Sequence, residues 1–484
     1  MTRIRILLSV IFILFSFQLF SQDSDKETPQ AKYVFLFIGD GMGQAQVNLA
    51  EAYLSALKGE AGLTHLSFTR LPQTGFVSTY ANDRFITCSA AAATAIATGS
   101  KTNIGRIGMD TSGTVRLESI AEKARKKGMK VGIITSVSLD HATPAAFYAH
   151  QPDREMYFEI GWELLASDFN YFAGGGLIQP TGIYRDKQVN LLEEAKLRGY
   201  SVISTFAELK GLRTEGKTIY FCDSPASEAS LPFALDRPVQ QPSLADLTEK
   251  GINLLNNPKG FFIMVEGGKI DWAGHSNDAG TVVNEVIAFD QAVAKALEFY
   301  ERHPEETLIV VTADHETGGL ALGNQANGYD SRIDILKYQK ISYEALHNVV
   351  MMFREKKSDN INSDFDRVMK RVEKDYGLDS KENKTLLSPE EKGKLMEALR
   401  MTYYNEGGAE SEYSRLDPFT VEIIRLMSEK AGVGWTTTAH TGVNVPIFAI
   451  GPGAKKFSGY IDNTDIARIL ERLIGISGGK QREQ

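Results

Sequence analysis

The chain has 484 residues, of which 43% are hydrophobic and 24% charged, and these values are ordinary for a soluble globular protein. Its formal net charge of -8 argues against nucleic acid as a specific partner, because a protein that binds a phosphate backbone presents a basic face. The same charge does not exclude a small phosphate-bearing substrate, since a bound metal ion reverses the local sign.

Residues 1–21 have the pattern of a secretory signal peptide. Arg3 and Arg5 precede an apolar run from Ile6 to Phe20, which is too short for a comfortable membrane span and ends in polar chain. The alternative is an uncleaved membrane anchor, but no second apolar run of spanning length follows in the sequence. We therefore expect a periplasmic or secreted protein with no stable membrane anchor.

Five apolar runs that do not alternate with polar residues are typical of buried parallel strands. Helical patterns lie between several of these runs, for example before and after the third. This alternation predicts an α/β fold with a doubly wound, mostly parallel central sheet and helices on both faces. The five runs are 33–39, 130–137, 260–267, 307–314 and 445–451.

The region 321–434 differs from the rest of the chain. It is charged and mostly helical in pattern, and no run in it is convincing as a buried strand. Because a strand pattern resumes after it, we expect a helical insertion between two parts of one core. The core would then comprise residues 32–320 and 435–475.

Acidic, hydroxyl and histidine side chains stand next to the ends of these runs. In a doubly wound sheet, ligands bind outside the carboxyl ends of the strands. Each motif alone has an ordinary explanation, such as a helix N-cap or a surface ion pair, but five such motifs at one sheet edge are improbable as accidents. These side chains are ligands that zinc and magnesium require. They are Asp40, His141, Thr143, Glu266, Asp271, His275, Asp314, His315 and His440.

The number of these ligands matches a site with two zinc ions, which is the usual clamp for in-line displacement at phosphorus. Each zinc ion needs about three protein ligands. The two sets are Asp271 with His275 and His440, and Asp40 with Asp314 and His315. Glu266 and Thr143 are hard oxygen donors, and with Asp40 as a bridging ligand they would suit one octahedral magnesium ion.

The stretch ITCSAAAATAIATGS places three candidate nucleophiles, Thr87, Cys88 and Ser89, before a run of alanines. Alanine favours helix, so we expect a helix that begins near Ser89 and ends before Gly99. Free N–H groups at a helix N-terminus favour an anion such as a serine alkoxide or a phosphoryl group. On this evidence alone, an N-cap role for Ser89 is favoured over a nucleophilic one.

The sequence resembles the alkaline phosphatase family in six motifs that occur in order over roughly residues 32–470, apart from the insertion. They are FIGDGMG, TCSAAAATAIATGSKT, HATPAAFYAHQPDR, FFIMVEGGKIDWAGHSND, VTADHETGG and TAHTG. The resemblance implies that Ser89 is the nucleophile that becomes phosphoserine and also a metal ligand, and that Thr87 packs at a strand end. It implies that Arg154 holds two phosphate oxygens, for which a planar guanidinium is suited.

The resemblance further implies the ligand sets given above, with two Zn2+ and one Mg2+, and an exported enzyme that hydrolyses small phosphate monoesters. A homodimer is compatible with it. Three positions depart from the most familiar pattern. Cys88 replaces an aspartate that would help to hold Arg154. His141 and Trp272 replace the aspartate and lysine of some members, so Trp272 would face the phosphate without a charge. An imidazole at His141 would let the third site accept Zn2+.

Three other functions were weighed against a phosphomonoesterase. Arg154 argues against a phosphodiesterase, because its side chain would crowd a second ester group. A sulfatase would carry its nucleophile in a Cys-x-Pro-x-Arg context, which Cys88 and Ser89 lack. A periplasmic phosphate- or metal-binding protein would not need a nucleophile beside two metal sites. The sequence therefore favours the phosphomonoesterase.

Overall fold

The structure is a computed structural model that describes residues 30–213, 216–404, 409–411 and 414–476. The predicted signal peptide, 1–21, lies outside the described residues. Within the described part of the chain, each helix is too short or too polar to cross a membrane.

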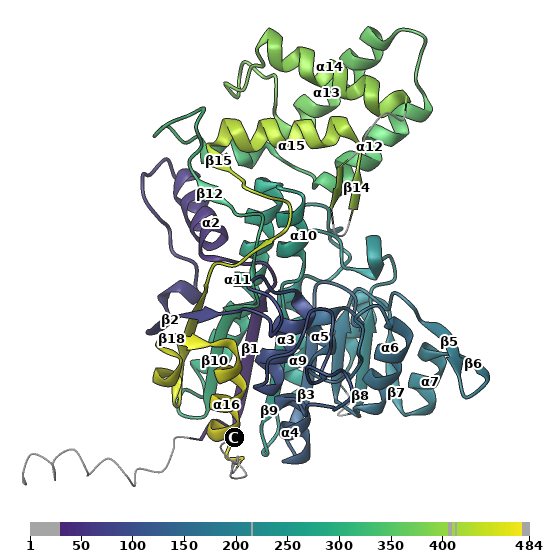
Figure 1. The fold of residues 1–484 in the computed structure, drawn as a ribbon, viewed down its shortest axis with the longest axis vertical. Helices are drawn as coiled ribbons and strands as arrows, with labels where there is room; N and C mark the ends of the chain where they lie inside the picture. Colours follow the sequence, from purple (N-terminus) through teal and green to yellow (C-terminus); the bar gives the residue numbers. More distant parts are fainter. Residues whose placement is uncertain (1–29, 214–215, 405–408, 412–413, 477–484) are drawn as a thin grey trace, which may run out of the picture.

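A ten-stranded sheet forms the centre of the molecule (Figure 1). Its strand order is β18-β2-β17-β10-β1-β9-β3-β4-β8-β7. The bounds in that order are Gly459–Asp462, Gln73–Ser78, Val445–Ile450, Thr307–Ala313, Tyr33–Gly39, Phe261–Glu266, Lys130–Thr135, Tyr171–Gly174, Lys217–Phe221 and Tyr200–Ile203. From β10 to β7 all neighbouring strands are parallel, which confirms the predicted mostly parallel sheet.

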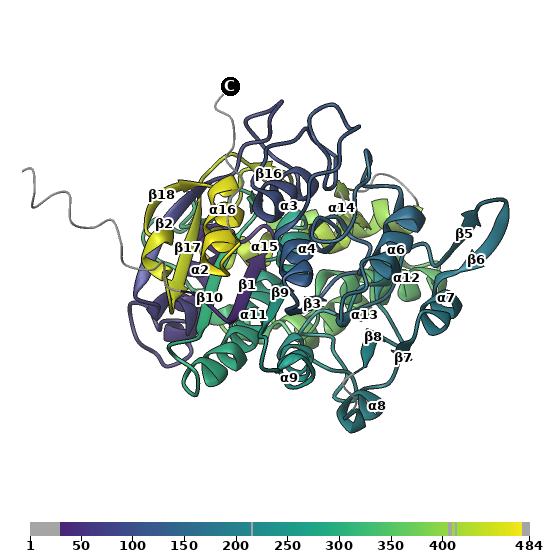
Figure 2. The same cartoon turned by 90° about the horizontal axis from the view of Figure 1, so that it is seen from below.

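Helices cover both faces of this sheet, as the alternating pattern predicted (Figure 2). On one face lie α3 (Ser89–Thr98), α4 (Ile120–Lys126) and α16 (Asn463–Leu473), and on the other α9 (Leu244–Leu255) and α11 (Ala279–Tyr300). Helix α3 is buried along its whole length, which its small alanine side chains permit. It ends at Gly99, whose φ of 75° is left-handed and suits glycine.

The fifth apolar run was expected to be parallel, and this was wrong: β17 runs antiparallel to both β10 and β2. The reason lies just upstream, where β16 (His440–Thr441) pairs with β11 (Glu316–Thr317) beyond the end of β10. The chain is therefore already at the carboxyl edge of the parallel strands when β17 begins, and it can only run back across the sheet in the opposite direction.

Four helices of the region 321–434 lie beyond that edge of the sheet, in the upper part of Figure 1. They are α12 (Tyr343–Glu355), α13 (Ile361–Tyr376), α14 (Pro389–Tyr404) and α15 (Pro418–Ala431). The chain leaves the core after β12 (Ala321–Leu322) and returns through β15 (Val433–Gly434), and these two strands pair with each other. That this region is a separable insertion stays a prediction.

Candidate metal and catalytic site

Three neighbouring strands deliver three carboxyl groups to one place. In the register of the sheet, Ile38 of β1 stands beside Glu266 of β9, and Gly39 stands beside Ala313 of β10. The next residues along β1 and β10 are Asp40 and Asp314, and both are buried, as is Glu266. These unbroken apolar strands thus end in a dense acidic cluster at the carboxyl edge of the sheet.

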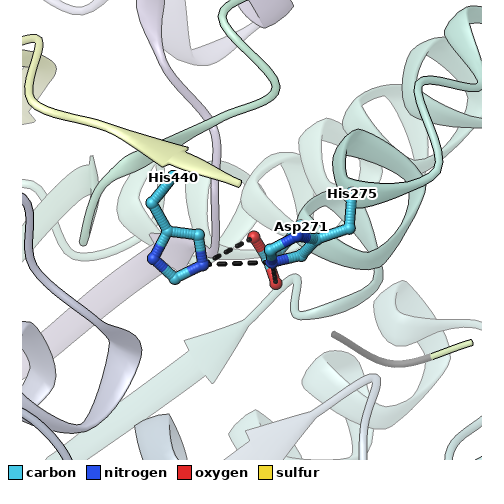
Figure 3. A group of neighbouring side chains, drawn as sticks. All are labelled: Asp271, His275 and His440. Atoms are coloured by element: carbon cyan, nitrogen blue, oxygen red, sulfur yellow. Dashed lines mark hydrogen bonds and ion pairs between the residues drawn. The ribbon is translucent and has the colours of Figure 1, made fainter. Parts of the chain in front are cut away.

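A first group of metal-ligating side chains comprises Asp271, His275 and His440, whose ligand atoms all lie within 4.8 Å of one another (Figure 3). Asp271 and His275 share one face of helix α10 (Lys269–His275), as their spacing of four predicted. The Nε2 atom of His275 lies 3.3 Å from Asp271 Oδ2 and 3.1 Å from Nε2 of His440. The short pairing of β16 with β11 brings His440 to this point.

Both imidazole rings of this group are oriented by backbone carbonyls. His275 Nδ1 lies 2.6 Å from the oxygen of Thr438, and His440 Nδ1 lies 2.9 Å from the oxygen of Thr87. A carbonyl only accepts hydrogen bonds, so each Nδ1 carries a proton and each ring turns its Nε2 atom towards Asp271. A backbone carbonyl that holds Nδ1 while Nε2 faces a carboxylate is a pattern typical of metal-bound histidines.

A second group comprises Asp40, Asp271 and His315. His315 Nε2 lies 3.3 Å from both Asp40 Oδ1 and Asp314 Oδ2, so Asp314 adjoins the group, as the predicted ligand set requires. The Thr317 hydroxyl donates to Asp271 and lies 3.3 Å from His315 Nδ1. Since that hydroxyl has one proton, it accepts from Nδ1, and the Nε2 lone pair of His315 faces the carboxylates.

A third group comprises Asp40, His141 and Glu266. Thr143, the other predicted ligand here, donates from its hydroxyl to Asp40 Oδ2 over 3.1 Å. The Thr135 hydroxyl donates to Glu266 Oε2. Asp40 belongs to two groups and Asp271 to two, so these carboxylates are placed to bridge neighbouring ions. The structure therefore brings all nine sequence-predicted ligands from the strand ends together.

The acidic groups of this cluster accept fewer hydrogen bonds than their burial requires. Among the described residues, one oxygen of each of four carboxyl groups accepts no hydrogen bond, namely in Asp40, Glu266, Asp271 and Asp314. A buried charged oxygen of this kind is costly unless a cation neutralises it. The donor set of buried carboxylate oxygens and oriented imidazole nitrogens therefore fits zinc and magnesium ions.

The acid–base properties of the carboxyl groups point the same way. Burial, reinforced by the neighbouring Asp271 carboxylate, raises the pKa of Asp314 to about 8. Burial likewise raises the pKa of Glu266 to about 7. Burial acts on Asp271 as well, but the adjacent His275 and His440 outweigh it and hold its pKa below the usual range. So many buried carboxyl groups in contact are not all ionised at neutral pH unless cations are bound.

Ser89 is the first residue of α3, and the N-cap is Cys88, so the N-cap role weighed for Ser89 is wrong. The Ser89 hydroxyl is buried and lies 3.2 Å from Nε2 of His315. The Ser89 hydroxyl thus lies at a helix N-terminus, which favours an anion, and it also contacts His315 of the second group. Thr87 was expected to pack at a strand end, but it lies in the loop before α3 and its carbonyl orients His440.

Arg154, the predicted phosphate-binding residue, contacts the third group through His141. Its Nη2 atom lies 3.3 Å from His141 Nε2. Burial, with the nearby guanidinium, lowers the pKa of His141 to about 3, so the ring is neutral and accepts from Arg154. The ring of Trp272 lies edge-on to that of His141, at 5.9 Å between centroids, and is buried. His141 and Trp272 therefore lie side by side next to Arg154.

Cys88 is connected to Arg154 through the backbone of Gly105. The Cys88 sulfur accepts from the Gly105 N–H over 3.3 Å, and the Gly105 carbonyl accepts from the Arg154 N–H over 2.8 Å. The thiol supplies no charge to the guanidinium, but it holds the loop to which the arginine backbone is attached.

Comparisons with known proteins identify the family to which this sequence and fold are similar. The family model described as "Alkaline phosphatase" matches residues 31–168 and 177–476. Alkaline phosphatase 4 of Bacillus subtilis is 32% identical over 460 residues, which cover 93% of this chain and 90% of that protein. The crystal structure of a cold-active alkaline phosphatase from Shewanella sp. matches with a TM-score of 0.76 and 30% identity, over 91% of this chain and 99% of the other. That of Thermus thermophilus alkaline phosphatase has a TM-score of 0.76 and 25% identity, over 94% of each chain.

Proposed function

Because the chain belongs to the alkaline phosphatase family, we propose that it is an exported enzyme that hydrolyses small phosphate monoesters through a phosphoserine at Ser89. The observation that carries the proposal is the position of the Ser89 hydroxyl. It stands at the N-terminus of α3, 3.2 Å from His315 Nε2 and next to the clustered metal-ligating side chains. A buried hydroxyl in that place is suited to attack a phosphorus atom held by metal ions.

Two zinc ions and one magnesium ion fit the three groups. One zinc would be held by Asp271, His275 and His440. The other would be held by Asp40, Asp314 and His315, with the Ser89 oxygen as a further ligand. Glu266, Thr143 and Asp40 would hold magnesium, and the neutral His141 ring would let this third site accept zinc as well. Such ions, when bound, neutralise charge on the phosphoryl group and lower the pKa of bound water.

The reaction of this chain's own residues follows from their placement. Arg154 binds phosphate oxygens with its planar guanidinium and orients the ester. The Ser89 oxygen forms a bond to phosphorus as the bond from phosphorus to the alcohol oxygen breaks. A water molecule then cleaves the phosphoserine, which releases phosphate and restores the Ser89 hydroxyl. Trp272, beside His141, would border the phosphate without adding a charge.

A comparison of three substrates tests this proposal. The purified protein should hydrolyse p-nitrophenyl phosphate much faster than bis(p-nitrophenyl) phosphate or p-nitrophenyl sulfate, because Arg154 leaves no room for a second ester group. Metal analysis of the same sample should find zinc and magnesium. Preference for the diester or the sulfate, or turnover by protein free of divalent metal, would contradict the proposal. The predicted export and a homodimer are tested separately, by N-terminal sequencing of the mature protein and by light scattering.

A further inference from the structure

A cavity of about 680 Å³ lies beside the metal-ligating groups, between the end of helix α10 and helix α15. Its volume is in the range of small-molecule binding sites. His275, which belongs to the first group, also lines this cavity, and so does Thr438, whose carbonyl accepts from the His275 ring. His275 thus turns Nε2 to Asp271 and His440, and the same residue forms part of the cavity wall.

The wall of the cavity is mainly apolar and includes an aromatic ring. Its apolar side chains come from the insertion and its return strand, namely Leu416, Val421, Ile424, Val433 and Trp435. The indole of Trp435 packs directly on the backbone of Gly318, where an added Cβ would come within 2.6 Å of the ring. The Trp435 Nε1 atom donates to the Ser428 hydroxyl over 3.3 Å. The Trp435 ring is thereby held against Gly318, the residue that follows Thr317, and Thr317 orients His315.

The direction of the reaction relates this cavity to the substrate. The Ser89 hydroxyl contacts His315, so it approaches phosphorus from the side of the second group. In an in-line displacement the alcohol oxygen leaves on the opposite side. That side is the first group, to which His275 belongs. The rest of the alcohol then extends away from the first group, and the cavity is the neighbouring space that His275 also lines.

We propose that this cavity binds the alcohol part of the substrate, and that the enzyme prefers phosphate monoesters of alcohols that carry an apolar ring. This inference rests on the function proposed for Ser89. A ring of that kind buries apolar surface against Val421, Ile424 and Trp435, which is favourable in proportion to the area removed from water. A short alkyl alcohol does not reach these side chains and gains nothing from them.

The test compares 2-phenylethyl phosphate with ethyl phosphate, because both leaving groups are primary alcohols of similar acidity and differ in the ring. The wild-type enzyme should show a kcat/KM at least about tenfold higher for the ring-bearing substrate, mostly through a lower KM. Val421→Trp, which fills the cavity from the half-buried face of α15, should lower kcat/KM for 2-phenylethyl phosphate far more than for ethyl phosphate and so remove that preference.

Two further variants keep the test decisive. Ala326→Trp adds bulk to the cavity from an exposed loop and does not depend on the packing of α15, so it should act like Val421→Trp. Met352→Trp, at a 58% exposed position of α12 outside the cavity, should keep the wild-type preference. Equal kcat/KM for the two substrates in the wild type, or an equal loss for both in the cavity variants, would overturn the inference while ethyl phosphate turnover still supports the phosphatase. Absence of turnover with both substrates would instead overturn the proposed function, and the cavity proposal with it.

Discussion

The Nε2 atoms of His275 and His440 lie 3.1 Å apart although the two residues are 165 positions apart in the chain. Each ring is turned into this position by a hydrogen bond from its Nδ1 atom to a backbone carbonyl, of Thr438 and Thr87 respectively. The protein thus fixes the direction of both Nε2 atoms through main-chain atoms. Asp271 completes the group from the same helix face as His275.

Removal of metal should abolish activity, and zinc with magnesium should restore it. One carboxyl oxygen in each of Asp40, Glu266, Asp271 and Asp314 accepts no hydrogen bond within the described chain, so bound cations are needed to neutralise this cluster. Because the ions bind the folded state, chelation should also lower Tm. Activity and Tm after dialysis against a chelator, and after addition of each metal, measure both effects. Full activity in protein free of zinc, and of cobalt as a substitute, would disprove the two-zinc site.

Ser89→Ala should lose the covalent phosphoenzyme, and its kcat/KM should fall by roughly 10³-fold or more. Cys88→Ala should keep the phosphoenzyme, because the thiol acts on the Gly105 backbone and not on phosphorus. The measurement is a rapid acid quench followed by mapping of the phosphorylated peptide. A phosphoenzyme in Ser89→Ala, or phosphate located on Thr87, would show that the nucleophile is misassigned.

His141→Asp should shift the third site towards magnesium. The imidazole is a softer donor than a carboxylate, and it lies with Asp40 and Glu266 in the third group. Excess zinc should therefore inhibit the wild type by displacing magnesium, and it should inhibit the variant less. Zinc titrations of both proteins at fixed magnesium check this outcome. Identical inhibition curves would mean that His141 serves Arg154 and not the metal.

Trp272→Lys should tighten inhibition by inorganic phosphate, because it adds an ammonium group beside His141 and Arg154. The structure adds a cost to this expectation. The Lys269 ammonium already lies 4.5 Å from the centre of the Trp272 ring and is fully buried, so a second buried cation should lower Tm. The phosphate inhibition constant and Tm are measured together. A lower Tm with an unchanged inhibition constant would identify Trp272 as a packing residue only.

Stability should fall as pH rises from about 6.5 to about 9 because of His150, four residues before Arg154. Burial lowers the pKa of His150, but ion pairs to Glu122 at 3.4 Å and Glu163 at 3.3 Å outweigh it and raise that pKa to about 9. The ordinary value of about 6.5 holds in the unfolded chain. The protonated His150 side chain therefore adds roughly 3 kcal/mol to the free energy of unfolding below about pH 6.5. This stabilisation is lost as the pH rises through about 9, the pKa of His150 in the folded protein.

His150→Gln tests this pH dependence. Urea unfolding of the variant at pH 6 and pH 9.5 should show a smaller difference in the free energy of unfolding than the wild type shows. His65→Gln is the matched control, since His65 also pairs with a glutamate, Glu51, but its side chain is 51% exposed. Its pH dependence should equal that of the wild type. An unchanged pH dependence in His150→Gln would refute the assignment.

The sequence predicted the longer buried strands at the centre of the sheet. Strands β1, β9 and β10 are unbroken apolar runs, and such runs have few alternatives to a central parallel strand. Strands β4, β7 and β18 were missed because each is only four residues long, and strands β2 and β8 were missed as well. The direction of β17 depends on the pairing of β16 with β11, which is a contact between distant segments and has no local pattern.

The same limit applies to the site. That the nine proposed ligands lie together was predictable, because acidic, hydroxyl and imidazole groups at strand ends are chemically distinctive. The groups that orient them were not, because Thr87 and Thr438 act through carbonyl oxygens, which every residue possesses. Thr317 differs because it acts through its side chain: its hydroxyl contacts both His315 and Asp271. Its position in the motif VTADHETGG could have identified it as an orienting residue.

The pairing of β12 with β15 has a consequence for how such an enzyme diversifies. Leu322, where the chain leaves the core, is the ladder partner of Val433, where it returns, so the two ends are about 5 Å apart. If the region 321–434 is a separable insertion, as the sequence predicts, a segment whose ends meet at that spacing should be exchangeable at this pair of strands with His440 kept in place. Under the proposals made above, such an exchange would replace part of the cavity wall and so change substrate preference, while the residues proposed for the chemistry would stay the same.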